Sequence, residues 1–170
     1  MSEMQFFTDG ELYERQMGRW SRLAGAIFLD WLAVPNGLRW LDVGCGNGAF
    51  TETLIARCAP AAVHAVDPSQ AQVAYAASRR RANNAQFGVG DSMALPYSNG
   101  SFDVAVMALV ISFVSDPARA VSEMVRVVRP GGWVAAYMWD IPGGGLPLAP
   151  LRKAVVAAGL PAPATLPGAE

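Results

Sequence analysis

The sequence predicts an open, doubly wound α/β sheet, mostly parallel, of about five strands preceded by N-terminal helices. Apolar segments and helical segments alternate repeatedly between residues 38 and 140. The apolar segments are nearly continuous, which is typical of parallel strands buried on both faces. The first of them ends in glycines spaced Gly-x-Gly-x-Gly and is followed by a helical pattern, which is the opening of a βαβ unit.

The first 37 residues are predicted to form a helical cap (1–37). Thr8-Asp9-Gly10-Glu11 offers an N-cap followed by an acidic first turn. A second helix starts or continues at Ser21 and ends at Pro35-Asn36-Gly37.

Residues 38–140 are predicted to form the sheet domain. Strands are expected at 39–43, 62–66, 85–89, 102–108 and 133–139, and helices at 48–58, 70–82 and 116–128. Asp116 and Pro117 suit the start of the last helix, and Pro130-Gly131-Gly132 predicts a sharp turn before the last strand. Residues 141–170 are expected to form a Gly- and Pro-rich loop, a short helix over 148–158 and a disordered tail.

Composition excludes several classes of protein. The 170 residues are 52% hydrophobic and 16% charged, with a net charge of −1, as in one globular domain. The only basic run, Arg79–Arg81, is interpreted as the solvated end of a helix, so no nucleic-acid partner is expected. No apolar segment reaches the ~18 residues of a membrane span, and no signal pattern is present. We therefore expect a cytoplasmic protein in which Cys45 and Cys58 are free thiols.

Candidate binding residues follow the predicted strands, because open parallel sheets bind ligands at the carboxyl ends of their strands. After the first strand, Gly44 and Gly46 let a ligand lie against bare backbone, and we expect the first N–H groups of the next helix to face that ligand. Asp67 follows the second strand, about twenty residues on, where an acid binds ribose hydroxyls. Asp91 follows the third strand and suits an adenine amino group, with Met93 packing on the ring.

Each of these residues also has a purely structural explanation. The glycines can serve the turn alone, Asp67 can cap the next helix, Asp91 can form an Asx-turn and Met93 can belong to the core. The functional interpretation is favoured because all of them fall on one edge of the sheet.

The glycine spacing narrows the class of ligand. A dinucleotide site favours Gly-x-Gly-x-x-Gly, and a phosphate loop requires Lys followed by Ser or Thr. Neither pattern occurs here, and no basic residue stands near the glycines. An adenosine-containing ligand without phosphates is therefore expected.

Four segments carry a resemblance to a known family. Leu41-Asp42-Val43-Gly44-Cys45-Gly46-Asn47-Gly48 resembles the first motif of class I S-adenosylmethionine-dependent methyltransferases, and Val66-Asp67-Pro68-Ser69 resembles the next motif. Gly90-Asp91 through Leu95-Pro96-Tyr97 with Ser101-Phe102-Asp103, and Arg129-Pro130-Gly131-Gly132, are similar to the small-molecule branch that includes the ubiquinone and menaquinone biosynthesis enzymes. The match covers about Tyr13 to Asp140 and implies a Rossmann-like, cofactor-binding core.

The resemblance implies S-adenosylmethionine as the cofactor and a role for each motif residue. Gly44 and Gly46 would hold its amino-acid part, and Asp42 would orient either the turn or the cofactor ammonium through water. Asp67 would bind the ribose, and Asp91 and Ser92 the adenine, with Met93 stacking. Arg19 is either a partner of the cofactor carboxylate or a surface arginine. The remaining expected cofactor contacts are Tyr13, Pro68 and Leu109.

The resemblance further implies methyl transfer to a small-molecule acceptor. Because the cofactor brings the reactivity, we name no catalytic residue and no metal ligand. His64 lies in mid-strand and is interpreted as structural, whereas Trp139 and Asp140 are candidates for acceptor contact. A cofactor-binding module without turnover and an NAD-dependent oxidoreductase are the alternatives.

The sequence departs from the family's pattern after the fifth strand. The family usually adds a sixth strand and an antiparallel seventh, and neither is predicted here. The fifth strand would then be an apolar edge, which favours pairing with another chain. We expect either a homodimer that covers this edge or a chain that is a fragment.

Overall fold

The computed structural model describes residues 18–140 and 149–159, in which five parallel strands form one sheet in the order β3-β2-β1-β4-β5. The strands are β1 (Arg39–Val43), β2 (Ala62–Asp67), β3 (Ala85–Val89), β4 (Phe102–Ala108) and β5 (Val128–Tyr137). The helices are α3 (Arg19–Leu32), α4 (Ala49–Cys58), α5 (Gln70–Ala77), α6 (Pro117–Val127) and α7 (Ala149–Ala157), with short 3-10 turns η2 (Arg80–Ala82) and η3 (Ile111–Phe113). The predicted doubly wound α/β fold is confirmed.

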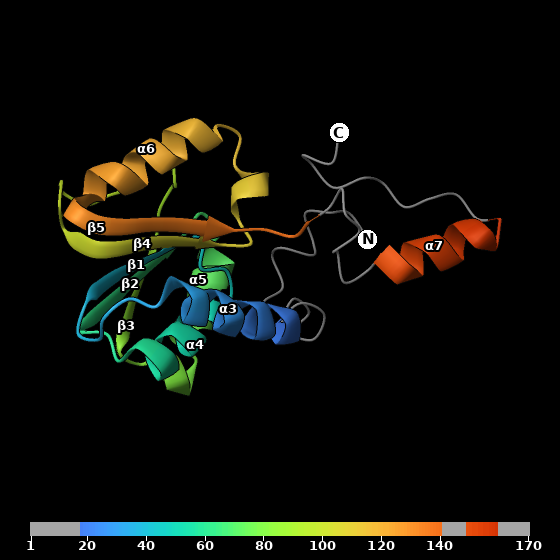
Figure 1. Ribbon diagram of the computed structural model, residues 1–170, viewed down its shortest axis with the longest axis horizontal. Coiled ribbons are helices and arrows are strands. Elements are labelled where there is room, and N and C mark those ends of the chain that lie inside the picture. Colours follow the sequence, from blue (N-terminus) through green and yellow to red (C-terminus); the bar gives the residue numbers. More distant parts are fainter. Residues whose placement is uncertain (1–17, 141–148, 160–170) are drawn as a thin grey trace.

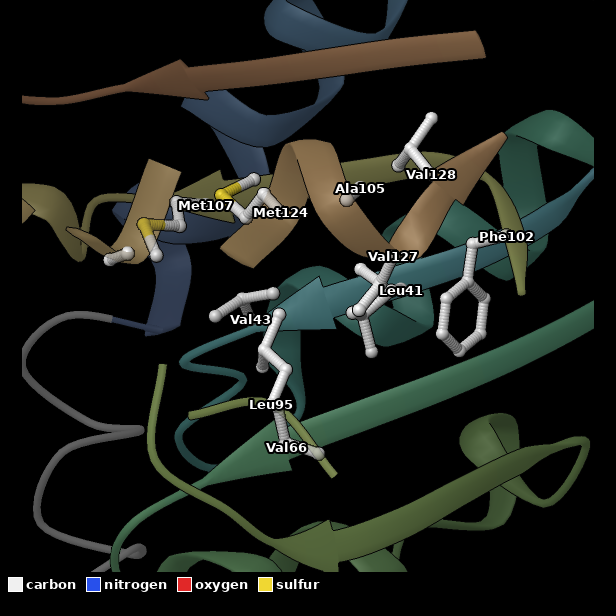
Figure 2. Packing of buried hydrophobic residues seen from close by; sticks show 11 residues of the cluster. Leu41, Val43, Val66, Leu95, Phe102, Ala105, Met107, Met124, Val127 and Val128 are labelled. Carbon is white, nitrogen blue, oxygen red and sulfur yellow. The ribbon is translucent and has the colours of Figure 1, made fainter. Parts of the chain in front are cut away.

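Helices cover both faces of the sheet (Figure 1). On one face, α6 packs its apolar side against the strands, and Figure 2 shows Met124 and Val127 of this helix beside the sheet residues Leu41, Ala105 and Met107. On the other face, α3 and α4 contribute a second cluster, which consists of Phe28, Leu29, Phe50, Leu54 and Cys58 against Trp40, Val63, Val104 and Val106. Burial on both faces explains why β1 and β4 are nearly continuous apolar runs, whereas β3, at the edge of the sheet, is partly exposed.

Local sequence sets the starts of two helices: Asp116 caps α6 as expected, whereas α5 is capped by Ser69 and not by Asp67, for which that role was one explanation. The Asp116 carboxylate accepts a hydrogen bond of 3.0 Å from the backbone N–H of Arg119, and Pro117 occupies the first turn of α6. The Ser69 hydroxyl accepts from the N–H of Gln72 at the start of α5. Because β2 and β4 are both parallel to β1, the strand ends that precede α5 and α6 lie at the same edge of the sheet.

The predicted helix over 70–82 is wrong in its second half. The helix α5 ends at Ala77, where the Ser78 hydroxyl donates to the Tyr75 carbonyl at 2.6 Å, and Arg79 is extended before η2. The Arg79 side chain is only 12% exposed and pairs with Glu52 at 2.8 Å. It is therefore not part of a solvated helix end, although Arg80 and Arg81 are exposed as expected.

The predicted last strand, 133–139, is also wrong in its bounds. Val128 already pairs with Phe102, the register shifts across Pro130-Gly131-Gly132, and pairing resumes between Val104 and Trp133. The expected turn is thus an irregularity inside β5 rather than its start. This strand lies at the edge of the described sheet.

The remaining expectations fall into three groups. Both cysteines are buried free thiols, as predicted. Within the described ranges, no helix is long and apolar enough to cross a bilayer. The first predicted helix, the 141–148 loop and the 160–170 tail lie outside the described residues, and the division into a cap, a core and a tail stays a prediction.

Candidate functional site

A cavity of about 480 Å³ opens at the carboxyl edge of the sheet. Its lining comes from the segments that follow β1, β2, β3 and β4. These residues are Gly44, Gly46, Asp67, Pro68, Ser69, Gln72, Gly90, Asp91, Ser92, Met93, Leu109, Val110, Phe113, Val114 and Ser115. A volume of this size lies in the ~300–1,000 Å³ range of small-molecule sites.

The glycine turn after β1 approaches the segment after β4 closely. Gly44 has φ +78°, and a Cβ atom built on it would lie 2.5 Å from Val110 Cγ1. Gly46 has φ +51°, and a Cβ atom there would meet nothing within 4 Å. The first glycine is thus required by packing, whereas the space over the second is open to the cavity that it lines.

The backbone N–H groups of this turn are used within the protein. Those of Gly44 and Cys45 donate to the Val66 carbonyl at 2.8 and 3.0 Å. The N–H of Gly46 donates to Asp67 Oδ2 at 2.9 Å, and the N–H of Ala49 donates to Asn47 Oδ1 at 3.1 Å. We expected the first N–H groups of α4 to face a ligand, and for Ala49 this is wrong, because its own turn supplies the acceptor.

Asp67 joins the first two strands at the cavity. Its Oδ2 accepts from Gly46, and its Oδ1 accepts from the N–H of Ser69 at 2.9 Å. Burial raises the pKa of Asp67, while the two N–H donors oppose the rise. The carboxylate therefore organises the glycine turn and the start of α5, and it also lines the cavity.

Asp42 lies beneath the turn and does not line the cavity. Its side chain is fully buried, and Oδ2 accepts a hydrogen bond of 2.6 Å from the Thr51 hydroxyl of α4. No hydrogen-bond partner is found for Oδ1 in the described part of the chain. Burial raises the pKa of Asp42 to about 7, and the nearby Asp67 adds to the rise. The structure shows a contact of Asp42 with α4, and its two expected roles, at the turn or at a cofactor ammonium, stay predictions.

The loop after β3 forms a second wall of the cavity. Asp91 Oδ1 accepts from the N–H of Met93 at 2.8 Å, so the Asx-turn that was one explanation of Asp91 is present. The same Asp91 lines the cavity together with Ser92 and Met93. Met93 is partly buried and packs against the core cluster under α6, so its structural explanation also holds in part.

The segment after β4 forms an apolar third wall. Leu109 has φ +64°, a left-handed conformation that is uncommon for a residue with a side chain, and its N–H donates to the Tyr137 carbonyl at 2.9 Å. Val110, Phe113 and Val114 continue the wall through η3. The strained leucine turns the chain out of β4 and over the cavity.

Some expected site residues are not brought to the described cavity. Tyr13 lies outside the described residues, and Arg19 begins α3 at a position whose side chain the structure does not describe. Trp139 and Asp140 follow β5 and do not line the cavity. His64 stacks edge-on against the rings of Tyr97 and Phe102, and burial lowers its pKa.

Two features of the site were missed in the sequence. Arg79 donates from Nε to the carbonyl of Asn47 and from Nη1 to Glu52, so it supports the glycine turn from 32 residues away. No local sequence pattern predicts a contact of this kind. Phe113, Val114 and Ser115 also line the cavity. The rule that ligands lie beyond strand ends would have found them had it been extended beyond Leu109, the one residue after β4 that was expected as a cofactor contact.

The charge of the cavity lining is one-sided. Asp67 and Asp91 contribute carboxylates, and the described lining residues include no Arg, Lys or His. Such a lining favours a neutral or cationic ligand over a pyrophosphate.

Comparison with known proteins assigns the family. A model described as "Methyltransferase domain" matches residues 41–136, which include all the lining residues of the cavity and the whole sheet except Arg39, Trp40 and Tyr137. This chain belongs to the methyltransferase domain family.

Individual relatives agree with this assignment. A demethylmenaquinone methyltransferase from Renibacterium salmoninarum is 32% identical over 125 residues, which cover 74% of this chain and 49% of that protein. A solved S-adenosylmethionine-dependent methyltransferase from Thermotoga maritima, named as a possible histamine N-methyltransferase, shares 29% identity with a TM-score of 0.60, over 76% of this chain and 57% of that one. The solved [4+2]-cyclase SpnF shares 32% identity with a TM-score of 0.60, over 66% of this chain and 43% of that one.

The matched segment is only part of the relatives. The chain spans about half, or less, of the length of the curated relatives it matches.

Proposed function

We propose that the cavity binds S-adenosylmethionine and that the protein to which this domain belongs transfers its methyl group to a small-molecule acceptor. The observation that carries the proposal is the one-sided charge of the lining, in which Asp67 and Asp91 stand without a basic partner among the described lining residues. S-adenosylmethionine bears a sulfonium, an ammonium and one carboxylate, so its net charge is positive, and it has no phosphate. A dinucleotide would bring two phosphate charges against these carboxylates.

The glycine turn supports the same choice. A pyrophosphate site needs free backbone N–H groups at a helix N-terminus, and here the N–H groups of Gly46 and Ala49 are donated to Asp67 and Asn47. An uncharged nucleoside needs bare backbone rather than free donors. The open space over Gly46 provides it.

The described residues fit the parts of the cofactor. Asp67 would accept the ribose hydroxyls with the lone pairs that Gly46 and Ser69 leave free, and Pro68 would flank the sugar. Asp91 and Ser92 would meet the adenine, with Met93 and Leu109 on its faces. Gly44 and Gly46 would lie against the amino-acid part, with Asp42 holding the turn from below. Tyr13 and Arg19 stay proposed contacts, with Arg19 as the partner for the carboxylate.

The bound cofactor would supply an activated methyl group on sulfur. The chain's own residues position it and exclude water, for which the apolar wall of Leu109, Val110 and Phe113 is suited. A nucleophilic acceptor needs no general base from this wall. The name of the demethylmenaquinone methyltransferase relative suggests demethylmenaquinone or a similar small molecule as the acceptor.

A second candidate function is cofactor-dependent chemistry or binding without methyl transfer. The similarity to SpnF, a [4+2]-cyclase, favours it, because that protein has the same fold at 32% identity and a different reaction in its name. The two candidates share the cofactor cavity and differ only in turnover.

An assay with methyl-labelled S-adenosylmethionine separates the two candidates. The labelled cofactor is first shown to bind, and demethylmenaquinone and a panel of phenols, amines and quinols are then offered as acceptors. Appearance of label in an acceptor supports the methyltransferase. Tight binding of both the cofactor and its demethylated product with no transfer across the panel favours the second candidate.

A further inference from the structure

Three charged residues of α6 form a polar stripe that faces the loop of residues 91–99. Arg119, Glu123 and Arg126 are spaced by four and three residues, which places them on one side of the helix. A different side, with Ala120, Met124 and Val127, is buried in the core. The helix therefore has a packing face and a separate polar stripe.

The stripe satisfies the backbone of the loop. Arg126 donates from Nη1 to the Tyr97 carbonyl at 2.7 Å and from Nη2 to the Leu95 carbonyl at 2.9 Å. It also donates to Asn99 Oδ1 at 3.0 Å. Glu123 Oε2 accepts from the N–H of Leu95 at 2.9 Å and pairs with Arg126 at 2.7 Å. Both polar backbone groups of Leu95 are thus held by one ion pair.

The side chain of Leu95 fixes the loop from its other side. It is only 4% exposed, and Figure 2 shows it with Val43 and Val66 in the core cluster. The hydrogen bonds within the loop are local: the bridge between Asp91 and Ala94, the Met93 N–H to Asp91 Oδ1, and the Tyr97 N–H to the Leu95 carbonyl. The contacts with the stripe and the burial of Leu95 together fix the position of the loop along α6.

The N-terminal end of the stripe reaches the cavity wall directly. Arg119 Nε donates to the Met93 carbonyl at 3.0 Å, and the Ser115 hydroxyl donates to Met93 Sδ at 3.4 Å. Met93 and Ser115 both line the cavity. The start of α6 therefore holds Met93 by its backbone and by its side chain.

We propose that Arg119, Glu123 and Arg126 are positioning residues that fix the wall of Asp91, Ser92 and Met93 against the nucleoside part of the ligand. None of the three lines the cavity, so they act through the loop. In this inference, the identity of the ligand rests on the proposed function. The contacts between α6 and the loop are properties of the protein alone.

Arg119 gives the sharpest test, because it is exposed and bonds a single loop carbonyl. Arg119→Gln removes the charged donor, Arg119→Lys keeps one, and Arg81→Gln is the matched control, since Arg81 is exposed and lies in η2, which precedes β3, whereas the loop follows β3. Calorimetry would follow S-adenosylmethionine and adenosine, which share only the nucleoside part. We expect Arg119→Gln to weaken both by about three- to tenfold, with recovery in Arg119→Lys and no change in the control.

A readout without ligand separates positioning from general stability. In protein labelled at the methionine methyl carbons, the Met93 resonance is assigned with Met93→Leu and should shift in Arg119→Gln but not in Arg81→Gln. Hydrogen exchange at the Leu95 amide should accelerate in Arg126→Lys, because an ammonium cannot span the three acceptors.

Several outcomes would overturn the inference. An unchanged Met93 resonance in Arg119→Gln would do so, as would an equal affinity loss in the Arg81→Gln control. Failure of the wild-type protein to bind S-adenosylmethionine would instead overturn the proposed function, while the Met93 resonance and the Leu95 exchange would still decide whether α6 positions the loop.

Discussion

Replacing Asp42 by Asn should remove much of the pH dependence of stability near neutrality. Asp42 is fully buried, with Thr51 as the donor to one oxygen and no partner found for the other in the described residues. Burial raises its pKa from 3.8 to about 7. An Asn side chain keeps a carbonyl oxygen for the Thr51 hydroxyl and cannot ionise.

The sign of the effect follows from the raised pKa. Between about pH 4 and pH 7 the folded protein keeps a proton on Asp42 that the unfolded chain has released. The free energy of unfolding therefore has its full value below about pH 4, falls as the pH rises, and reaches its lower limit above about pH 7. The change in pKa from 3.8 to about 7 corresponds to roughly 4 kcal/mol over the whole window.

Urea unfolding at pH 5, 6, 7 and 8 measures this contribution. The wild-type free energy of unfolding should fall by roughly 3 kcal/mol from pH 5 to pH 8 relative to Asp42→Asn. Asp67 also has a raised pKa, but it is present in both proteins and cancels in the comparison. Asp103 and Glu123, whose pKa values are lowered by their hydrogen-bond donors, act at lower pH and cancel too. Parallel pH profiles for the two proteins would show that Asp42 does not contribute to the pH dependence of stability.

Further substitutions test the cavity and the sheet edge. Gly44→Ala should destabilise the fold by about 1–3 kcal/mol in urea unfolding, because its Cβ would lie 2.5 Å from Val110. A free energy of unfolding equal to that of the wild type would show that the segment after β4 moves to make room for the methyl group. Gly46→Ala meets no atom within 4 Å, so its cost to stability comes from the left-handed φ of +51° and should be about 1–2 kcal/mol. The loss of ligand binding free energy should exceed this cost, and the reverse order would place the ligand elsewhere. Asp67→Ala should weaken S-adenosylmethionine binding by about 1–3 kcal/mol, and unchanged affinity in calorimetry would remove Asp67 from the site. If a second copy covers β5, sedimentation should show a dimer, whereas a clean monomer would exclude that arrangement.

The sheet was predictable because its signals are local. The continuous apolar runs set the bounds of β1 and β4 as the structure has them, since both strands are buried on both faces. The bounds of β3 also match the prediction, although this edge strand is partly exposed. The end of α5 was not predictable from periodicity, because it depends on Arg79 reaching Glu52 and the Asn47 carbonyl. The start of β5 was missed because Pro130-Gly131-Gly132 is a stop pattern in sequence, and pairing on both sides of it depends on β4.

The positions of the candidate site residues were predictable from the sequence, whereas the contacts that hold these residues in place were less so. The rule that ligands lie beyond strand ends placed Asp67 and Asp91 at one cavity, whichever role they have in binding. The same residues also satisfy their own turns, so their two explanations are not exclusive. The contacts that hold these turns, from Arg79 and from Arg126 of α6, join residues about thirty positions apart. Such contacts have no local sequence pattern.

Calorimetric titration of the purified chain with S-adenosylmethionine, its demethylated product and NAD tests directly whether the cavity binds S-adenosylmethionine rather than a dinucleotide. A cavity with two carboxylates and no basic lining residue in the described part should bind the first two ligands and not NAD. Asp67→Ala serves as the control that ties the heat of binding to this cavity. Binding of NAD alone would contradict the account, because it would require a site for a pyrophosphate that the lining and the glycine turn do not provide.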